Sequence, residues 1–263
     1  MRKETFSHSA GGIDWHCERA GQGPTLVLVP SGEGDCSSFD VLRDHLAAHF
    51  SVLTFDMPGF SRSSAAQGEG AMAIAALSHH IAALVRSLGI DRASYYGCSS
   101  GGRAVLDLVI EYPDLVRNVI MHEVALPNPW IDANFAPMIE MPDEQIVGVC
   151  THVYANILNE DAVAWQALGG DYHQRLSRNY ITWVRNYLKQ GVGTSPAPEK
   201  LRDQPITWTI GDLSPPEPMA SNVELAQRAG IALGRLPCRH FPQVSIPDKL
   251  AAHIVAATQP HLA

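Results

Sequence analysis

Short apolar runs recur along the chain, and stretches with helical periodicity separate them. The runs cover residues 26–29, 52–56, 93–96, 119–121, 205–210 and 231–236. Continuous apolar runs of this length are typical of strands that are buried on both faces of a parallel sheet. Residues 13–18 follow Gly11-Gly12, so we expect them to form an early hairpin strand.

Helical periodicity is clearest over residues 71–88, where apolar side chains recur at steps of three and four. Gly89 is placed to end this helix. A second helix is expected from about Ser100 to Tyr112, before Pro113. The alternation of strands and helices predicts an α/β fold with a mostly parallel central sheet flanked by helices. In such sheets, ligands bind beyond the carboxyl ends of the strands.

Residues 125–195 break this alternation. Prolines interrupt the first part, and a helical pattern then runs through Ile146, Val149, Val153 and Ile157. Aromatic residues follow, including Trp183 and Tyr187, and residues 191–198 have the glycine and proline content of a linker. We therefore expect a helical cap at 125–195, inserted into a core domain made of residues 1–124 and 196–263.

The sequence Gly97-Cys98-Ser99-Ser100-Gly101 follows an apolar strand and precedes a helix. In this context a Gly-x-Ser-x-Gly pattern predicts a sharp strand-to-helix turn that exposes the serine above the sheet. A serine hydroxyl needs such fixed geometry and a neighbouring base before it becomes a nucleophile. Ser99 is the predicted nucleophile.

The base is predicted from chain position, because twelve histidines leave spacing uninformative. His240 follows the last predicted strand, where the order serine, acid, histidine places the base. Two carboxylates could orient it, since Glu123 and Asp212 each follow a strand. Strand order alone mildly favours Asp212, and the choice stays open at this point.

Backbone N–H groups are expected to bind the oxyanion of the reaction. One belongs to Ser100, directly after the nucleophile, and the other belongs to the loop that begins Pro30-Ser31-Gly32. Gly32 is the natural donor because glycine lets substrate approach the backbone closely. The loop lacks the Lys-Ser/Thr ending and the Gly-x-Gly-x-x-Gly spacing of nucleotide phosphate sites.

Composition excludes several other classes of function. The 263 residues carry a formal net charge of −8 with scattered basic residues, which argues against nucleic-acid binding. No apolar run is long enough for a membrane span, and the first residues lack the apolar core of a secretory signal, so we expect a cytoplasmic protein. Five widely spaced cysteines form neither a disulfide framework nor a zinc pattern. We expect no metal and no organic cofactor.

Five segments of the chain resemble a known family. The segments are 55–63, which reads Phe-Asp-Met-Pro-Gly-Phe-Ser-Arg-Ser, the Ser99 pattern, His122-Glu123, residues 164–169 and His240-Phe241-Pro242. Together they resemble the zearalenone hydrolases, a family of lactonases with the α/β-hydrolase fold. The His-Glu pair and the Trp-Gln-Ala-Leu-Gly of 165–169 are more specific than the serine pattern. The resemblance spans nearly the whole chain.

The resemblance implies that Glu123 is the acid, which moves it ahead of Asp212. It also implies that Trp183 hydrogen-bonds an ester oxygen of the substrate, and that the ring-opened product loses carbon dioxide in a later step. Further substrate contacts are expected from Tyr187 and Val153 in the cap. Ser31, Gln243 and Ile246 depart from the family's pattern, and we expect Ser31 and Gln243 to lie at the substrate.

These observations predict a serine hydrolase that opens a macrocyclic lactone through an acyl-enzyme, with a small molecule as its partner. Zearalenone and its derivatives are the substrates that the resemblance implies. Two alternatives stay open: a general carboxylesterase acting on smaller esters, and a hydrolase-fold receptor with slow turnover. A homodimer is possible in each case.

Overall fold

A computed structural model describes residues 3–262 of the chain. Its centre is an eight-stranded sheet in the order β1-β2-β4-β3-β5-β6-β7-β8. The first two strands, β1 (Glu4–Ala10) and β2 (Ile13–Ala20), form an antiparallel hairpin, and β2 is also antiparallel to β4 (Ser51–Phe55). All other pairs are parallel and involve β3 (Thr25–Val29), β5 (Ala93–Cys98), β6 (Val116–His122), β7 (Ile206–Gly211) and β8 (Leu233–Leu236).

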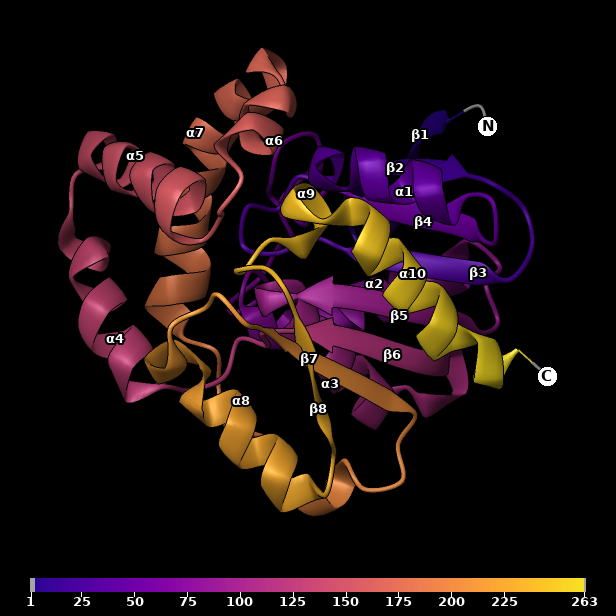
Figure 1. Cartoon of the computed structure of the whole chain (residues 1–263). Coiled ribbons are helices and arrows are strands. Elements are labelled where there is room, and N and C mark those ends of the chain that lie inside the picture. Colours follow the sequence, from indigo (N-terminus) through magenta and orange to yellow (C-terminus); the bar gives the residue numbers. More distant parts are fainter. Residues whose placement is uncertain (1–2, 263) are drawn as a thin grey trace.

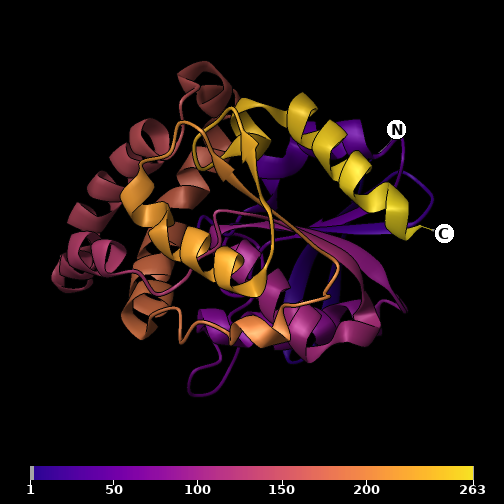
Figure 2. The same cartoon turned by 60° about the horizontal axis from the view of Figure 1, so that its bottom comes forward.

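Helices cover both faces of the sheet. One face packs on α2 (Leu77–Ser87), α3 (Ser99–Glu111) and α8 (Pro216–Ala229), and the other on α1 (Asp40–Leu46) and α10 (Pro247–Thr258). Figure 2 shows α10, in yellow, on one side of the strands. Within β3, Val27 and Val29 join the first core while Leu26 and Leu28 join the second, as the two-residue period of a strand requires. The prediction of an α/β fold with a mostly parallel sheet is confirmed.

A run of helices lies between β6 and β7, beyond the end toward which the parallel strands point (Figure 1). It has its own apolar cluster, centred on side chains such as Ile146, Tyr154 and Tyr180. From the sequence, prolines are expected to interrupt this part of the chain. Instead, Pro129 and Pro137 lie in the first turns of helical segments, where a missing N–H costs little. The segments are α4 (Pro129–Phe135), η4 (Ala136–Glu140), α5 (Asp143–His152), η5 (Val153–Ile157), α6 (Ala162–Ala167), α7 (Gly170–Thr182) and η6 (Trp183–Leu188).

Short helical turns complete the chain: η1 (Cys36–Phe39), η2 (Ile74–Ala76), η3 (Pro113–Leu115), η7 (Pro198–Lys200), α9 (Pro242–Ser245) and η8 (Gln259–His261). The helix expected from residue 71 begins later, because successive turns occupy residues 68–73 and α2 begins only at Leu77. Over residues 3–262, no helix is both long enough and apolar enough to cross a membrane.

The turn between β5 and α3 is closely packed. Ser99 has a φ of 53°, in the left-handed region that non-glycine residues rarely adopt. A Cβ on Gly97 would lie 2.3 Å from the carbonyl oxygen of Gly101, and one on Gly101 would lie 2.4 Å from the carbonyl oxygens of Val29 and Pro30. Both positions therefore require glycine, which lets α3 begin directly against β3 and β5.

The substitution Gly101→Ala should lower the free energy of unfolding by about 1–3 kcal/mol, because the new methyl group must push backbone apart. This loss would occur although alanine normally stabilises a helix interior by up to about 1 kcal/mol over glycine. Urea denaturation measures the change. The matched control is Gly148→Ala in α5, where nothing among the described residues lies within 4 Å of the added Cβ. We expect the control to be neutral or stabilising, and equal stabilities for the two variants would contradict the packing argument.

Candidate active site

Ser99 and Glu123 occupy equivalent places on neighbouring strands. Each directly follows its strand, and β5 pairs with β6 so that Cys98 lies opposite His122. Glu123 has a φ of 44°, so both residues adopt left-handed backbone. The backbone N–H of Ala125 donates to the carbonyl oxygen of Ser99 at 3.0 Å, which joins the two turns. The two side chains are thereby presented together above the carboxyl end of the sheet.

His240 meets Glu123 from the far end of the chain. It lies in the loop between β8 and α9, and its Nδ1 is 2.7 Å from Glu123 Oε2. The second carboxylate oxygen, Oε1, accepts a hydrogen bond from the backbone N–H of Gly211 at 2.9 Å. The backbone N–H of His240 donates to the carbonyl oxygen of Leu158 at 3.0 Å. With Nδ1 donating to the carboxylate, Nε2 is the ring nitrogen left to act as a base.

The electrostatics keep Glu123 ionised. Burial alone would raise its pKa, but the hydrogen bond from His240, the nearby imidazoles of His122 and His240, and the Ser214 hydroxyl outweigh burial and lower the pKa to about 2. Burial lowers the pKa of the neighbouring His122 to about 4, against the opposing effect of Glu123. His122 is therefore neutral near pH 7, and the carboxylate is free to stabilise a charged His240.

Asp212, the alternative acid, lies elsewhere. Its side chain is 52% exposed and lies 3.8 Å from the guanidinium of Arg235. Asp212 directly follows β7, and its backbone N–H donates to the carbonyl oxygen of Leu236 at the end of β8. The structure thus brings Glu123, and not Asp212, against His240.

A mostly apolar cavity of about 200 Å³ opens between the sheet and the overlying helices. Ser99, Ser100, Glu123 and His240 line it from the core side, together with Ser31. Gly32, the second predicted oxyanion donor, directly follows Ser31 but is not itself among the residues that line the cavity. Trp183 and Tyr187, two of the predicted substrate contacts, line it from η6. Its apolar lining also includes Leu126, Trp130, Phe135, Ile157, Leu158, Leu188, Val192, Pro215, Pro218 and Met219.

The loop after β3 lies under two aromatic side chains of the helical segment. A Cβ placed on Gly32 would lie 2.8 Å from Trp183 Nε1 and 3.0 Å from the Tyr154 hydroxyl oxygen. The loop is a tight turn, in which the N–H of Gly34 donates to the carbonyl oxygen of Ser31 at 3.0 Å. The absence of a side chain at Gly32 therefore makes room for these two polar groups.

Tyr154 is a cavity residue that the sequence analysis missed, whereas the predicted contact Val153 does not line the cavity. The buried stripe of α5 and η5 runs through Ile146, Cys150 and Tyr154, while Val149 and Ile157 are exposed. Tyr154 is buried because its ring packs against Tyr180, Trp183 and Phe241. Choosing the stripe at steps of four from Ile146 would have identified it.

Gln243, another predicted contact, is buried in α9 and is not among the residues that line the cavity. Ile246, directly after α9, is not among them either. The short α9 packs against α1, η1 and α6, which places it behind the histidine loop. Of the three departures from the family's pattern, only Ser31 lines the cavity.

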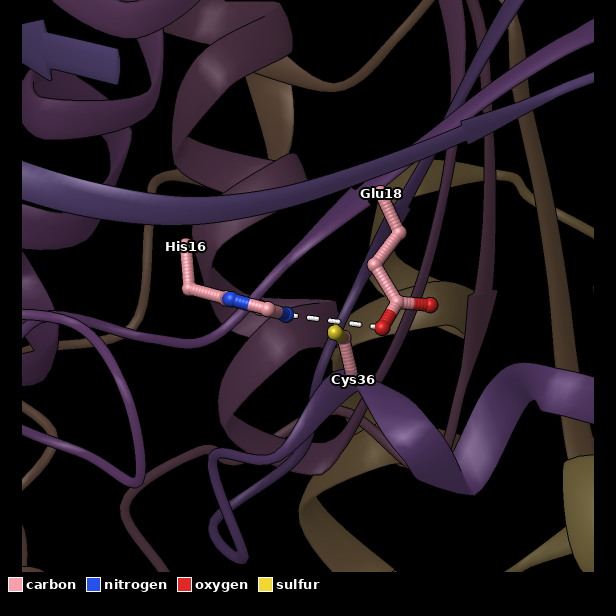
Figure 3. A group of neighbouring side chains, drawn as sticks. All are labelled: His16, Glu18 and Cys36. Atoms are coloured by element: carbon pink, nitrogen blue, oxygen red, sulfur yellow. Dashed lines mark hydrogen bonds and ion pairs between the residues drawn. The ribbon is translucent and has the colours of Figure 1, made fainter. Parts of the chain in front are cut away.

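One group in the described chain brings three potential metal ligands together: His16, Glu18 and Cys36, whose ligand atoms lie within 4.8 Å of one another (Figure 3). Cations already surround it. Arg43 and Lys3 lie 2.8 and 3.1 Å from Glu18 Oε2, and Arg62 donates to Cys36 Sγ at 3.4 Å.

Burial raises the pKa of Cys36 well above its usual value, so its thiol stays protonated. Burial also opposes ionisation of Glu18, but hydrogen bonds from His16 and Lys3 and the charges of Lys3 and Arg43 lower the pKa of this carboxyl to about 2. A metal site needs a deprotonated thiol and a free carboxylate. The group therefore fits an ion-pair network better than a metal centre.

The family of the chain follows from comparison with known proteins. A family model described as the alpha/beta hydrolase fold matches residues 24–149. A zearalenone hydrolase from Bionectria ochroleuca is 39% identical over 267 residues, covering 100% of both chains. A second zearalenone hydrolase, from Cladophialophora bantiana, is 37% identical and covers 95% of both chains.

Among solved structures, a thermophilic esterase from Thermogutta terrifontis is 19% identical, with a TM-score of 0.77 and full coverage of both chains. At this identity the structural likeness shows the fold alone. The two full-length relatives carry the assignment further, so the chain is a hydrolytic enzyme that belongs to the zearalenone hydrolase family of the α/β-hydrolase superfamily.

Proposed function

We propose that this enzyme is a serine hydrolase that opens the ester bond of a macrocyclic lactone, with zearalenone and its derivatives as substrates. The observation that carries the proposal is the 2.7 Å contact between His240 and Glu123 in an apolar cavity that Ser99 also lines. The substrate class rests on the two full-length relatives named zearalenone hydrolases. In this proposal residues 125–195 are a cap over a core of 1–124 and 196–263.

In the first half of the reaction, Ser99 attacks the lactone carbonyl while His240 Nε2 takes its proton. Glu123 holds the imidazole in the tautomer with Nδ1 protonated, and its negative charge stabilises the imidazolium. His240 then returns the proton to the leaving alkoxide, which opens the ring. In the second half, His240 takes a proton from water, which hydrolyses the acyl-enzyme and frees Ser99.

Backbone N–H groups of Gly32 and Ser100 bind the oxyanion of the tetrahedral intermediates. Donors of this kind stabilise a transition state by roughly 3 kcal/mol each. The Ser100 N–H lies at the start of α3, where unpaired helix N–H groups also favour negative charge.

Trp183 and Tyr154 are placed to recognise the ester group. An indole N–H only donates, so Trp183 suits a substrate oxygen, either the carbonyl or the leaving oxygen. The Tyr154 hydroxyl lies over the same glycine and can donate or accept. The apolar lining is suited to the hydrocarbon ring of a macrolactone.

The size of the cavity favours a second candidate, a general carboxylesterase that acts on smaller esters. The cavity of about 200 Å³ is smaller than the roughly 300–1,000 Å³ typical of sites for drug-sized ligands. A macrolactone would therefore require lining side chains to shift, whereas a short ester would not. The two candidates share the same proposed nucleophile, base and acid.

Multiple-turnover incubation with zearalenone, followed by chromatography and mass spectrometry, tests the proposal. The wild type should convert many equivalents to a ring-opened product, and Ser99→Ala should be slower by at least about 10³-fold because the nucleophile is gone. Intact zearalenone with rapid cleavage of p-nitrophenyl acetate would favour the carboxylesterase. Tight binding with no turnover would favour a receptor.

Replacement of the two carboxylates separates their roles. Glu123→Gln should lower kcat by roughly 10²–10⁴-fold, because the amide no longer stabilises the imidazolium or fixes its tautomer. The matched control, Asp212→Asn, should keep kcat within about twofold of the wild type, as expected for an exposed residue away from the reaction. Steady-state kinetics of both folded variants would contradict the assignment if Asp212→Asn lost more activity.

A further inference from the structure

The loop that carries Gly32 is held from above by a helix of the cap. The side-chain amide of Asn179 in α7 donates from Nδ2 to the carbonyl oxygen of Glu33 at 2.7 Å. This carbonyl is one residue beyond Gly32, whose N–H is the proposed oxyanion donor. Asn179 is 1% exposed, and it is not among the residues that line the cavity. Asn179 therefore does not contact a substrate in the cavity, and its hydrogen bond to Glu33 is a route by which it can act on the loop.

The hydrogen bonds of Asn179 fix the orientation of its amide. Nδ2 also donates to the Ser61 hydroxyl at 2.7 Å, and Oδ1 accepts from the backbone N–H of Ser61 at 2.9 Å. The Ser61 hydroxyl donates in turn to Asp35 Oδ2 at 2.6 Å. Since both amide groups are paired, a flip of the amide would replace attractive contacts with repulsive ones. Asn179 thus holds the Glu33 carbonyl in a defined position.

A second side chain of α7 anchors the same loop. Arg175 Nε and Nη2 lie 2.6 and 3.2 Å from the two carboxylate oxygens of the buried Asp35. Asn179 and Arg175 are one helical turn apart, so they lie on the same face of α7. Trp183 is one further turn along, and its Nε1 stands over Gly32. One face of this helical run therefore covers the loop and holds two of its residues, Glu33 and Asp35.

We propose that Asn179 is a positioning residue that holds the Gly32 N–H in line with the developing oxyanion. The inference rests on the proposed serine-hydrolase function. Oxyanion stabilisation depends on donors that are aligned before the reaction begins, and small displacements of such donors slow the chemistry. The Glu33 carbonyl is the acceptor through which α7 sets that alignment.

Asn179→Asp is the most direct test, because it keeps the shape of the side chain and replaces the Nδ2 donor with oxygen. We expect kcat on an activated ester to fall by about 10–100-fold with KM nearly unchanged, less than the loss of a whole oxyanion donor. The specific readout compares a p-nitrophenyl ester with its thiono analogue, in which sulfur replaces the carbonyl oxygen. Sulfur accepts hydrogen bonds poorly, so a misaligned donor should slow the oxo ester more. The oxo-to-thiono rate ratio should therefore fall.

Asn186→Ala in η6 is the matched control, because Asn186 Nδ2 donates to the Thr182 carbonyl oxygen within the same helical run. Its rate ratio should equal that of the wild type. Thermal unfolding of each variant reports its stability. If Asn179→Asp does not fold, Arg175→Gln breaks the second anchor of the same loop and should lower the ratio in the same direction.

A folded Asn179→Asp enzyme with an unchanged rate ratio would overturn the inference, even if its stability fell. The same outcome in Arg175→Gln would overturn it where Asn179→Asp does not fold. A wild type that opens no zearalenone and cleaves neither ester would refute the proposed function and the inference with it. Failure of the inference alone is distinguished by a wild type that cleaves the oxo ester in a Ser99-dependent manner.

Discussion

The site depends on two strained residues at the ends of neighbouring strands. Ser99 and Glu123 both have positive φ values, and a hydrogen bond from Ala125 to the Ser99 carbonyl joins their turns. Such backbone costs of order 1–3 kcal/mol for each residue and persists only where the surroundings leave no alternative. Here the surroundings are the β5–β6 register and the contact of Gly101 with β3. The strained backbone thus lowers the stability of the fold, and it places a hydroxyl and a carboxylate above the same edge of the sheet.

The helices between β6 and β7 contribute more than a cover over that edge. The Leu158 carbonyl accepts the backbone N–H of His240, and Asn179 donates to the Glu33 carbonyl beside Gly32. These contacts reach the histidine loop and the Gly32 loop, which are far apart in sequence. Figure 1 shows how the helical segment, at the left, stands over the strand ends from which both loops emerge. Hydrogen bonds therefore join the helices between β6 and β7 to both loops.

The sequence allowed most of the fold to be predicted, because the buried strands have continuous apolar runs and the helices are amphipathic. It missed β1, an edge strand that is mostly polar and pairs on one side only. The chemistry at the strand ends was harder to predict. Glu123 and Asp212 each follow a strand, and only the path of the loop after β8 determines which carboxylate meets His240.

The helical segment between β6 and β7 was the least predictable part of the chain. Val153 and Tyr154 are neighbours in the chain, and a one-residue difference decides which of them faces the cavity. The apolar pattern favoured the valine, but ring packing with Tyr180, Trp183 and Phe241 buries the tyrosine. The local pattern permits two stripes from Ile146, one that reaches Val153 and one that reaches Tyr154, and only packing between segments that are far apart in sequence decides between them. The roles assigned to Ser99, Glu123, His240 and Trp183 remain predictions.

Titration with a fluorophosphonate, which reacts covalently with activated serines, would test the nucleophile directly. Lactonase activity should fall in proportion to the fraction of chains that carry the adduct, and it should reach zero at one adduct per chain. Mass spectrometry should place the adduct on the peptide that contains Ser99. Saturating zearalenone should slow the labelling, because both molecules compete for the same hydroxyl. Activity that survived complete labelling, or an adduct on another residue that accounted for the loss, would contradict the account of this enzyme as a serine hydrolase acting through Ser99.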